Sequence, residues 1–189
     1  MSEAPVRLAV LVGSVREGRF APTVARWFAR EVHRHGGFAA DVIDLADVDL
    51  PLAMSGSAPH AGPLATRLSE ADGFVVITPE YNHSYPAALK NVVDWFHPQW
   101  QAKPVAFVSY GGLSGGLRAV EHLRAVFAEL HAVTIRDTVS FHGAHVRFDE
   151  DGAPVDTAAT ETAAKVLLDQ VEWWARALRD ARTVRAYPA

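Results

Sequence analysis

The segment GSVREGR, residues 13–19, follows a short apolar run and brings together groups that bind anions. Ser14 offers a hydroxyl, and Arg16 and Arg19 offer guanidinium groups that can form paired hydrogen bonds with a phosphate. A helix beginning near Pro22 would point the positive end of its dipole at the same place. We therefore predict a monophosphate site here, and an ordinary turn with solvated arginines stays open as the alternative.

The same segment excludes two better-known phosphate loops. A Walker loop needs Gly-Lys followed by Ser or Thr, and no such sequence follows. The dinucleotide fingerprint GxGxxG needs glycine at positions where Ser14 and Glu17 stand. The segment is therefore neither of these two phosphate-binding motifs.

A second polar loop, Pro79-Glu80-Tyr81-Asn82, follows the third apolar run. Pro79 would end a strand, and Asn82 or Ser84 could cap the next helix. Capping leaves Glu80 and Tyr81 unexplained. An aromatic ring beside exposed amide groups suits a flat, partly polar heterocycle, so we predict that this loop borders such a ring.

A third loop follows the fourth apolar run and reads Ser109-Tyr110-Gly111-Gly112. Two glycines without side chains would let a planar ligand lie against the backbone. Together the three loops predict a pocket that holds a phosphate at one end and a planar ring at the other.

Short apolar runs alternate with amphipathic stretches along the whole chain, which predicts an α/β fold. Several runs are apolar on both faces, as expected for parallel strands covered by helices above and below. The prediction is a doubly wound, five-stranded parallel sheet whose site lies at the C-terminal ends of the strands. The expected strands are 6–12, 38–43, 74–78, 105–109 and 132–139.

The helices are expected over 21–35, after Pro86, over 116–130 and over 162–180. In the last of them the helical spacing places one apolar stripe on the buried face: Ala163, Val166, Leu167, Val171, Trp174 and Leu178.

Composition sets broad limits on the function. The chain has 189 residues, 49% of them hydrophobic, and a formal net charge of −4, which argues against a nucleic-acid partner. It has no cysteine, so disulfides and thiolate metal sites are excluded, and a cytoplasmic location is expected. No apolar stretch approaches the roughly 20 residues of a membrane span. We expect one domain, residues 1–189, with no linker.

Two further clusters allow a functional and a structural interpretation. His142 and His145 lack a third placed ligand, so no metal site is predicted. The segment DWFHPQW, 94–100, gathers Trp95, Phe96 and Trp100, more aromatic surface than one helix end needs to bury. We interpret it as a subunit interface of a homodimer or homotetramer, with a purely internal role as the alternative.

Three motifs resemble those of the NADPH-dependent FMN reductases, flavodoxin-like flavoproteins that include quinone, azo-dye and chromate reductases. The motifs are GSVREGR at 13–19, PEYNHSYPAALKNVVDW at 79–95 and SYGGLSGG at 109–116. The resemblance spans roughly residues 6 to 140. It implies a flavodoxin-like fold, FMN as cofactor, NADPH or NADH as co-substrate and, since such reductases commonly form them, dimers or tetramers.

The resemblance also assigns residues to the two ends of FMN. Some relatives carry Ser and Asn where this chain has Arg19 and Ala21, and Arg19 is expected to compensate with its charge. The implied phosphate ligands are Ser14, Val15, Arg16 and Arg19, and the implied neighbours of the isoalloxazine are Pro79, Glu80, Tyr81, Asn82, Ser109, Gly111 and Gly112.

The implied activity is ping-pong hydride transfer from NADPH to the flavin and on to a small-molecule acceptor: a quinone, an azo compound or free flavin. A non-enzymatic electron carrier like flavodoxin, or a flavin-based redox sensor, is the alternative. Because the flavin carries the chemistry, no catalytic residue is expected. Tyr81 and His83 could each donate a proton to a quinone or simply line the pocket.

Overall fold

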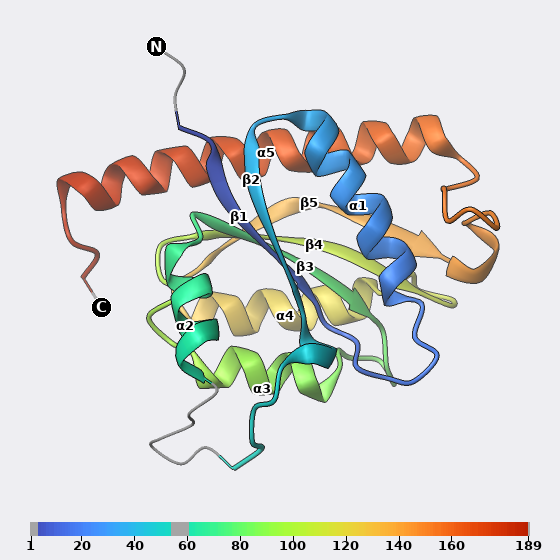
Figure 1. Ribbon diagram of the computed structural model, residues 1–189, viewed down its shortest axis with the longest axis horizontal. Helices are drawn as coiled ribbons and strands as arrows, with labels where there is room; N and C mark the ends of the chain where they lie inside the picture. Colours follow the sequence, from blue (N-terminus) through green and yellow to red (C-terminus); the bar gives the residue numbers. More distant parts are fainter. Residues whose placement is uncertain (1–3, 54–60, 189) are drawn as a thin grey trace.

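A computed structural model describes residues 4–53 and 61–188 and contains a five-stranded parallel sheet (Figure 1). The strand order is β2-β1-β3-β4-β5, so the chain reverses its direction across the sheet between β1 and β3. This is the doubly wound order expected from the alternating pattern. The strands are β1 Val6–Val12, β2 Phe38–Asp44, β3 Gly73–Pro79, β4 Pro104–Gly111 and β5 Val133–His142.

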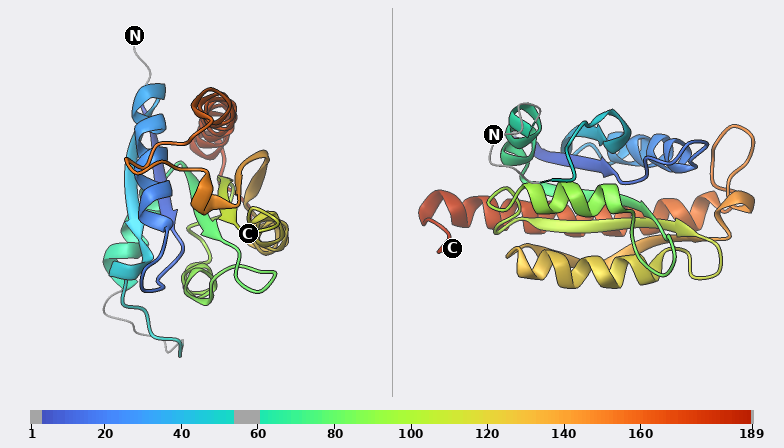
Figure 2. Two further views of the ribbon diagram at one scale, coloured as in Figure 1. Left: turned by 90° about the vertical axis from the view of Figure 1, so that its right-hand side faces the viewer. Right: turned by 90° about the horizontal axis from the view of Figure 1, so that it is seen from below.

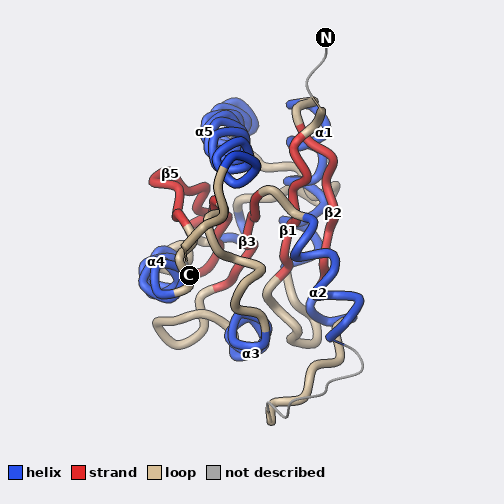
Figure 3. The backbone as a smooth tube through the Cα atoms, turned by 90° about the vertical axis from the view of Figure 1, so that its left-hand side faces the viewer, coloured by secondary structure: helices blue, strands red, loops and turns tan. Residues whose placement is uncertain are grey.

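All five predicted strands are confirmed to within three residues at each end. The central strands β3 and β4 are buried along nearly their whole length, because helices cover both of their faces. Figure 3 shows the strands side by side and twisted, with helices on both sides of them.

The helices form one layer on each face of the sheet (Figure 2). The inward faces of α1 and α5 share one apolar core with the sheet, and those of α2, α3 and α4 share a second one. Helix α2 was not singled out from the sequence. The helices are α1 Ala21–His35, α2 Ala61–Glu70, α3 Ala87–Trp95, α4 Leu117–Glu129 and α5 Thr157–Val184, with short 3-10 turns η1 Leu45–Asp47 and η2 Ala144–Val146.

The predicted buried face of α5 is confirmed at Leu167 and Val171, which are fully buried, and wrong at Val166 and Trp174. Val166 and Trp174 are 41% and 37% exposed, and the neighbouring Trp173 is 63% exposed. Small residues on the adjacent face, Ala164 and Ala175, are fully buried instead. Their size lets the helix approach the sheet closely, which the positions of the large apolar residues alone did not reveal.

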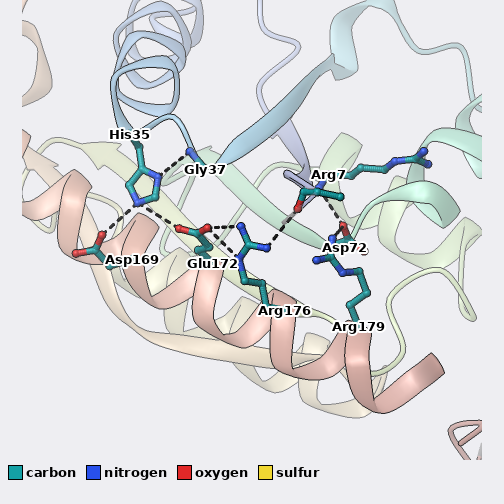
Figure 4. A network of polar contacts seen from close by, with 9 residues as sticks. Arg7, His35, Gly37, Asp72, Asp169, Glu172, Arg176 and Arg179 are labelled. Atoms are coloured by element: carbon teal, nitrogen blue, oxygen red, sulfur yellow. Dashed lines mark hydrogen bonds and ion pairs between the residues drawn. The ribbon is translucent and has the colours of Figure 1, made fainter. Parts of the chain in front are cut away.

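Polar contacts fasten α5 to α1 and to the start of β1 (Figure 4). His35, the last residue of α1, lies 3.1 Å from the carboxylate of Asp169. Asp72 accepts hydrogen bonds from the backbone N–H of Arg7 (3.0 Å) and the guanidinium of Arg179 (3.2 Å). These contacts lie at or near the N-terminal ends of the strands, so they hold the layers together away from the predicted site.

The interpretation of the aromatic segment 94–100 as a subunit interface is wrong for Phe96 and Trp100. Phe96 is 3% and Trp100 0% exposed, and both belong to the core under α3 and α4. The indole of Trp100 also donates to the carbonyl of Val93. The helix end buries more aromatic surface than expected because Phe74 and Phe127 pack against Trp100 from the sheet and from α4.

Among the described residues, no helix is long and apolar enough to cross a membrane.

Candidate functional site

The three polar loops meet at one edge of the sheet. They follow β1, β3 and β4, which are neighbours, and parallel strands end at the same edge. Figure 1 shows these loops on the side toward which the strands point. The structure therefore brings together the three segments that the sequence analysis selected.

The loop after β1 presents a row of unpaired amides. The N–H of Arg19 bonds to the carbonyl of Arg16 (3.2 Å), which closes a tight turn, and Gly18 takes a φ of +66° that favours glycine. Within the described chain, the backbone N–H groups of residues 15–18 have no hydrogen-bond partner. Helix α1 begins directly after the loop, and its first turn contains no acid. Successive free amides beside a helix N-terminus can bind an anion.

Arg19 does not reach outward from this loop. Its guanidinium forms two hydrogen bonds with the carboxylate of Asp44, at the end of β2, one of them 2.7 Å long, and it also donates to the carbonyl of Ser14 at 2.7 Å. The hydrogen bond with Asp44 is the main cause of a raised Arg19 pKa. Burial favours a higher pKa for Asp44, but hydrogen bonds from Arg19 and from the N–H of Ala46 outweigh it and lower the pKa.

Arg16 is the opposite case. Its side chain is exposed and makes no hydrogen bond or ion pair with any residue that the structure describes. The loop therefore offers one guanidinium that is free to bind an anion and one that is committed inside the protein.

The loop after β3 folds back on itself. Tyr81 and Ser84 exchange two backbone hydrogen bonds of 2.8 and 3.1 Å around the turn residues Asn82 and His83. Both turn residues have a positive φ, +50° and +72°, which asparagine tolerates better than most residues. The predicted capping of α3 by Asn82 or Ser84 is wrong, because Pro86 precedes the helix without a side-chain cap.

Glu80 joins this loop to the loop after β4. Its carboxylate accepts hydrogen bonds from the hydroxyl of Ser114, from the backbone N–H of Arg118 and from the Arg118 guanidinium. Burial favours a higher Glu80 pKa, but these donors outweigh it and keep the group ionised. The side chain that capping could not explain thus fixes the distance between two loops.

Tyr81 joins the same loop to the loop after β1. Its hydroxyl lies 2.7 Å from that of Ser14, and the Ser14 side chain is fully buried. Tyr110 lies nearby: burial raises the pKa of its hydroxyl, the presence of Tyr81 adds to this, and Ser14 opposes it. In the described part of the chain the buried hydroxyl of Tyr110 has no hydrogen-bond partner.

The loop after β4 has glycines with two different roles. A side chain at Gly112 would meet nothing within 4 Å, so this position is open to a ligand. A side chain at Gly116 would lie 2.7 Å from Ser109, and the hydroxyl of Ser109 donates to the carbonyl of Gly115 at 2.9 Å. Ser109 therefore shapes the loop from within.

Five residues of this edge were given no role in the sequence analysis: Asp44, Ser114, Gly115, Gly116 and Arg118. The second Gly-Gly pair of SYGGLSGG was a readable signal for a tight loop. Nothing in the sequence marked Asp44 or Arg118, because each acts across a long sequence separation. No group of three or more His, Cys, Asp or Glu side chains arranged to hold a metal ion occurs among the residues that the structure describes.

Comparisons with known proteins match most of the chain. The family "NADPH-dependent FMN reductase" matches residues 6–146 of the chain. An NADPH:quinone oxidoreductase of Arabidopsis thaliana is 33% identical over 175 residues, which cover 86% of the chain and 89% of that protein. An NAD(P)H-dependent FMN reductase of Schizosaccharomyces pombe is 37% identical over 120 residues, but the match spans only 58% of the chain and 60% of that protein.

Among solved structures, the flavoenzyme NAD(P)H:(acceptor) oxidoreductase FerB of Paracoccus denitrificans superimposes with a TM-score of 0.71. The match covers 90% of this chain and 97% of FerB at 22% sequence identity. It shows that the two proteins share a fold, which is flavodoxin-like as predicted.

Proposed function

Since this chain belongs to the NADPH-dependent FMN reductase family, we propose that it is an FMN-binding oxidoreductase that uses NADPH or NADH to reduce a quinone, an azo compound or free flavin. The observation that carries the proposal is the row of unpaired amides at residues 15–18 beside the free Arg16, at the edge where the ring-binding loops meet. This edge would suit a ligand with an anionic group at one end and a planar ring at the other.

At the phosphate end, the amides of residues 15–18 and the guanidinium of Arg16 would hold the FMN phosphate. Neither Ser14 nor Arg19 has its side chain directed to solvent, since Ser14 is buried against Tyr81 and Arg19 is held by Asp44. Charge-assisted hydrogen bonds that Arg16 donates to the phosphate would therefore supply most of the preference for a phosphorylated flavin.

At the ring end, the loop 79–84 and the open position at Gly112 would border the isoalloxazine. Glu80 keeps this loop at a fixed distance from the loop after β4. Bound FMN would supply the redox chemistry, by accepting a hydride from a nicotinamide and passing electrons on to an acceptor in a ping-pong scheme. The protein would contribute binding, orientation and exclusion of water.

The electron-carrier alternative is less well supported. The matched family and the relatives named above are reductases or oxidoreductases. A single FMN-binding domain over residues 1–189, a homodimeric or homotetrameric assembly and a cytoplasmic location remain predictions.

A turnover screen tests the proposed function. Purified protein with FMN would be mixed with NADPH or NADH and with quinones, azo dyes or free FMN, and consumption of the nicotinamide would be followed. The proposal expects acceptor-dependent consumption that needs FMN. The proposal would be contradicted if none of the tested acceptors supported consumption of the nicotinamide. Equal rates of consumption with and without FMN would contradict it too.

A further inference from the structure

The carboxylate of Asp44 lies at the end of β2, where the strand register places it beside Val12, the last residue of β1. Asp44 therefore lies next to the loop that carries the unpaired amides. The charge of a carboxylate so near a phosphate site is unfavourable in itself. A specific benefit must offset this repulsion if the site binds a phosphate.

The benefit of Asp44 follows from the contacts of Arg19, which binds both Asp44 and the carbonyl of Ser14. One nitrogen of its guanidinium donates both to Asp44 and to the carbonyl of Ser14, and the second nitrogen also donates to Asp44 (2.7 Å). Asp44 thereby holds the guanidinium by a bidentate pair of hydrogen bonds, and the guanidinium holds the Ser14 carbonyl. The contact is largely shielded, since the two side chains are 17% and 25% exposed.

The direction of one carbonyl decides the direction of the next amide. In a planar trans peptide the C=O of one residue and the N–H of the next point in opposite directions. Holding the Ser14 carbonyl toward Arg19 therefore turns the N–H of Val15 away from Arg19, as the first of the four unpaired amides. If the same peptide flipped, a carbonyl oxygen would face the phosphate instead.

We propose that Asp44 is a positioning residue for FMN binding: through Arg19 it fixes the Ser14–Val15 peptide so that the loop presents amides to the phosphate. Arg19 is part of this support and not a direct phosphate ligand. The proposal rests on the proposed function and assigns a role to a residue outside the three loops.

The sign of one effect separates this role from simple electrostatics. Asp44→Asn removes a negative charge near the phosphate, so electrostatics alone predicts tighter FMN binding. If Asp44 positions the loop, the same substitution weakens FMN binding, by about tenfold, and leaves riboflavin affinity within about twofold because riboflavin has no phosphate. Asp47→Asn is the matched control, since exposed Asp47 also acts on Arg19 by its charge but forms no hydrogen bond with it.

The experiment titrates wild type, Asp44→Asn, Asp47→Asn and Arg19→Lys with FMN and with riboflavin, using quenching of flavin fluorescence. Arg19→Lys keeps the charge but loses the planar fork, so it is expected to lose FMN affinity as Asp44→Asn does. It also decides the question if Asp44→Asn does not fold. FMN binding by both variants as tight as that of the wild type, or an equal loss for FMN and riboflavin, would overturn the inference.

The wild-type titration tells a failure of the inference from a failure of the proposed function. A wild type that binds no FMN overturns the proposed function and the inference with it. A wild type that binds FMN, together with an Asp44→Asn variant that binds it more tightly, overturns the inference alone.

Discussion

The carboxylate of Glu80, after β3, binds both the backbone N–H and the guanidinium of Arg118, at the start of α4, at 3.2 and 3.1 Å. This pair spans the two loops between which a flavin ring would lie. The ring end, where this pair lies, is distinct from the phosphate end, so substitutions at the two ends should have different effects on flavin binding. Changes at the ring end should alter the binding of FMN and riboflavin alike, and changes at the phosphate end should alter FMN binding only.

Glu80→Gln should weaken FMN and riboflavin binding equally, by about tenfold. The amide keeps the size of the side chain but loses the charge that holds Arg118, and charge-assisted hydrogen bonds contribute roughly 1.5–3 kcal/mol each. Fluorescence titration with both flavins measures the effect. Glu121→Gln is the control, because it changes a 70% exposed carboxylate on α4, the helix that carries Arg118. This variant should bind both flavins like the wild type. A loss confined to FMN would show that Glu80 acts at the phosphate end.

Arg16→Ala should weaken FMN binding about tenfold to a hundredfold and leave riboflavin affinity unchanged. The reason is that Arg16 is the exposed guanidinium of the loop, and its charge-assisted hydrogen bonds act only on a phosphate. Arg26→Ala, which removes an exposed arginine from α1, is the matched control. Equal affinity of the wild type for FMN and riboflavin would contradict the assignment of a phosphate site.

Tyr81→Phe should keep most flavin binding, and Tyr81→Ala should lose it. Phe retains the ring and forfeits only the hydrogen bond to Ser14, which costs about 1 kcal/mol, or roughly fivefold. Ala removes the ring and admits water beside the flavin. Binding should be measured together with the thermal midpoint of each variant. Wild-type binding by both variants would leave the loop 79–84 with no role beyond its turn.

Trp100→Glu should abolish folding and not merely dissociate an oligomer. The indole is fully buried between Phe74 and Phe127, and an unpaired charge there has no partner or solvent. Trp173→Glu is the matched control, because Trp173 is 63% exposed and its replacement should change the thermal midpoint little. Circular dichroism during heating compares the two variants, and a folded Trp100→Glu protein would revive the interface interpretation.

Lys103 should make stability rise between about pH 8 and pH 10. Burial lowers the pKa of this amine to about 8, against a usual value near 10.4, even though it donates to the carbonyls of Leu68 and Ser69. Between these two pH values the unfolded chain binds more protons than the folded one, so raising the pH favours folding.

Lys103→Met removes this titration. The stability of the wild type relative to the variant should increase by up to about 3 kcal/mol from pH 7 to pH 10, as measured by urea unfolding. A difference that stays constant with pH would show that the lysine keeps its ordinary pKa.

Much of the fold and the position of the site could be predicted from the sequence, because both depend on local patterns. Apolar runs identified β1 to β5, and parallel strands bring the loops after β1, β3 and β4 to one edge. The chemistry of the loops was readable for the same reason: Arg16 and Gly112 are exposed or open where the sequence placed them.

The partners of the polar side chains could not be predicted, because they lie far apart in the sequence. Arg19 looked like a free cation, and only the fold brings Asp44, 25 residues later, against it. Tyr81 likewise meets Ser14 across 67 residues. The sequence suggested that Trp100 lies on an exposed aromatic surface, because it does not reveal that Phe127 of α4 packs against Trp100.

The central claim is that this chain binds FMN and lets a nicotinamide reduce it, and one measurement tests both parts. The FMN-loaded protein is mixed with NADPH in the absence of oxygen and of any partner protein, and the flavin absorbance is followed in a stopped-flow instrument. Rapid, stoichiometric bleaching of the bound flavin is the predicted result. Flavin that stays oxidised until a separate reductase is added would contradict the claim and support an electron carrier.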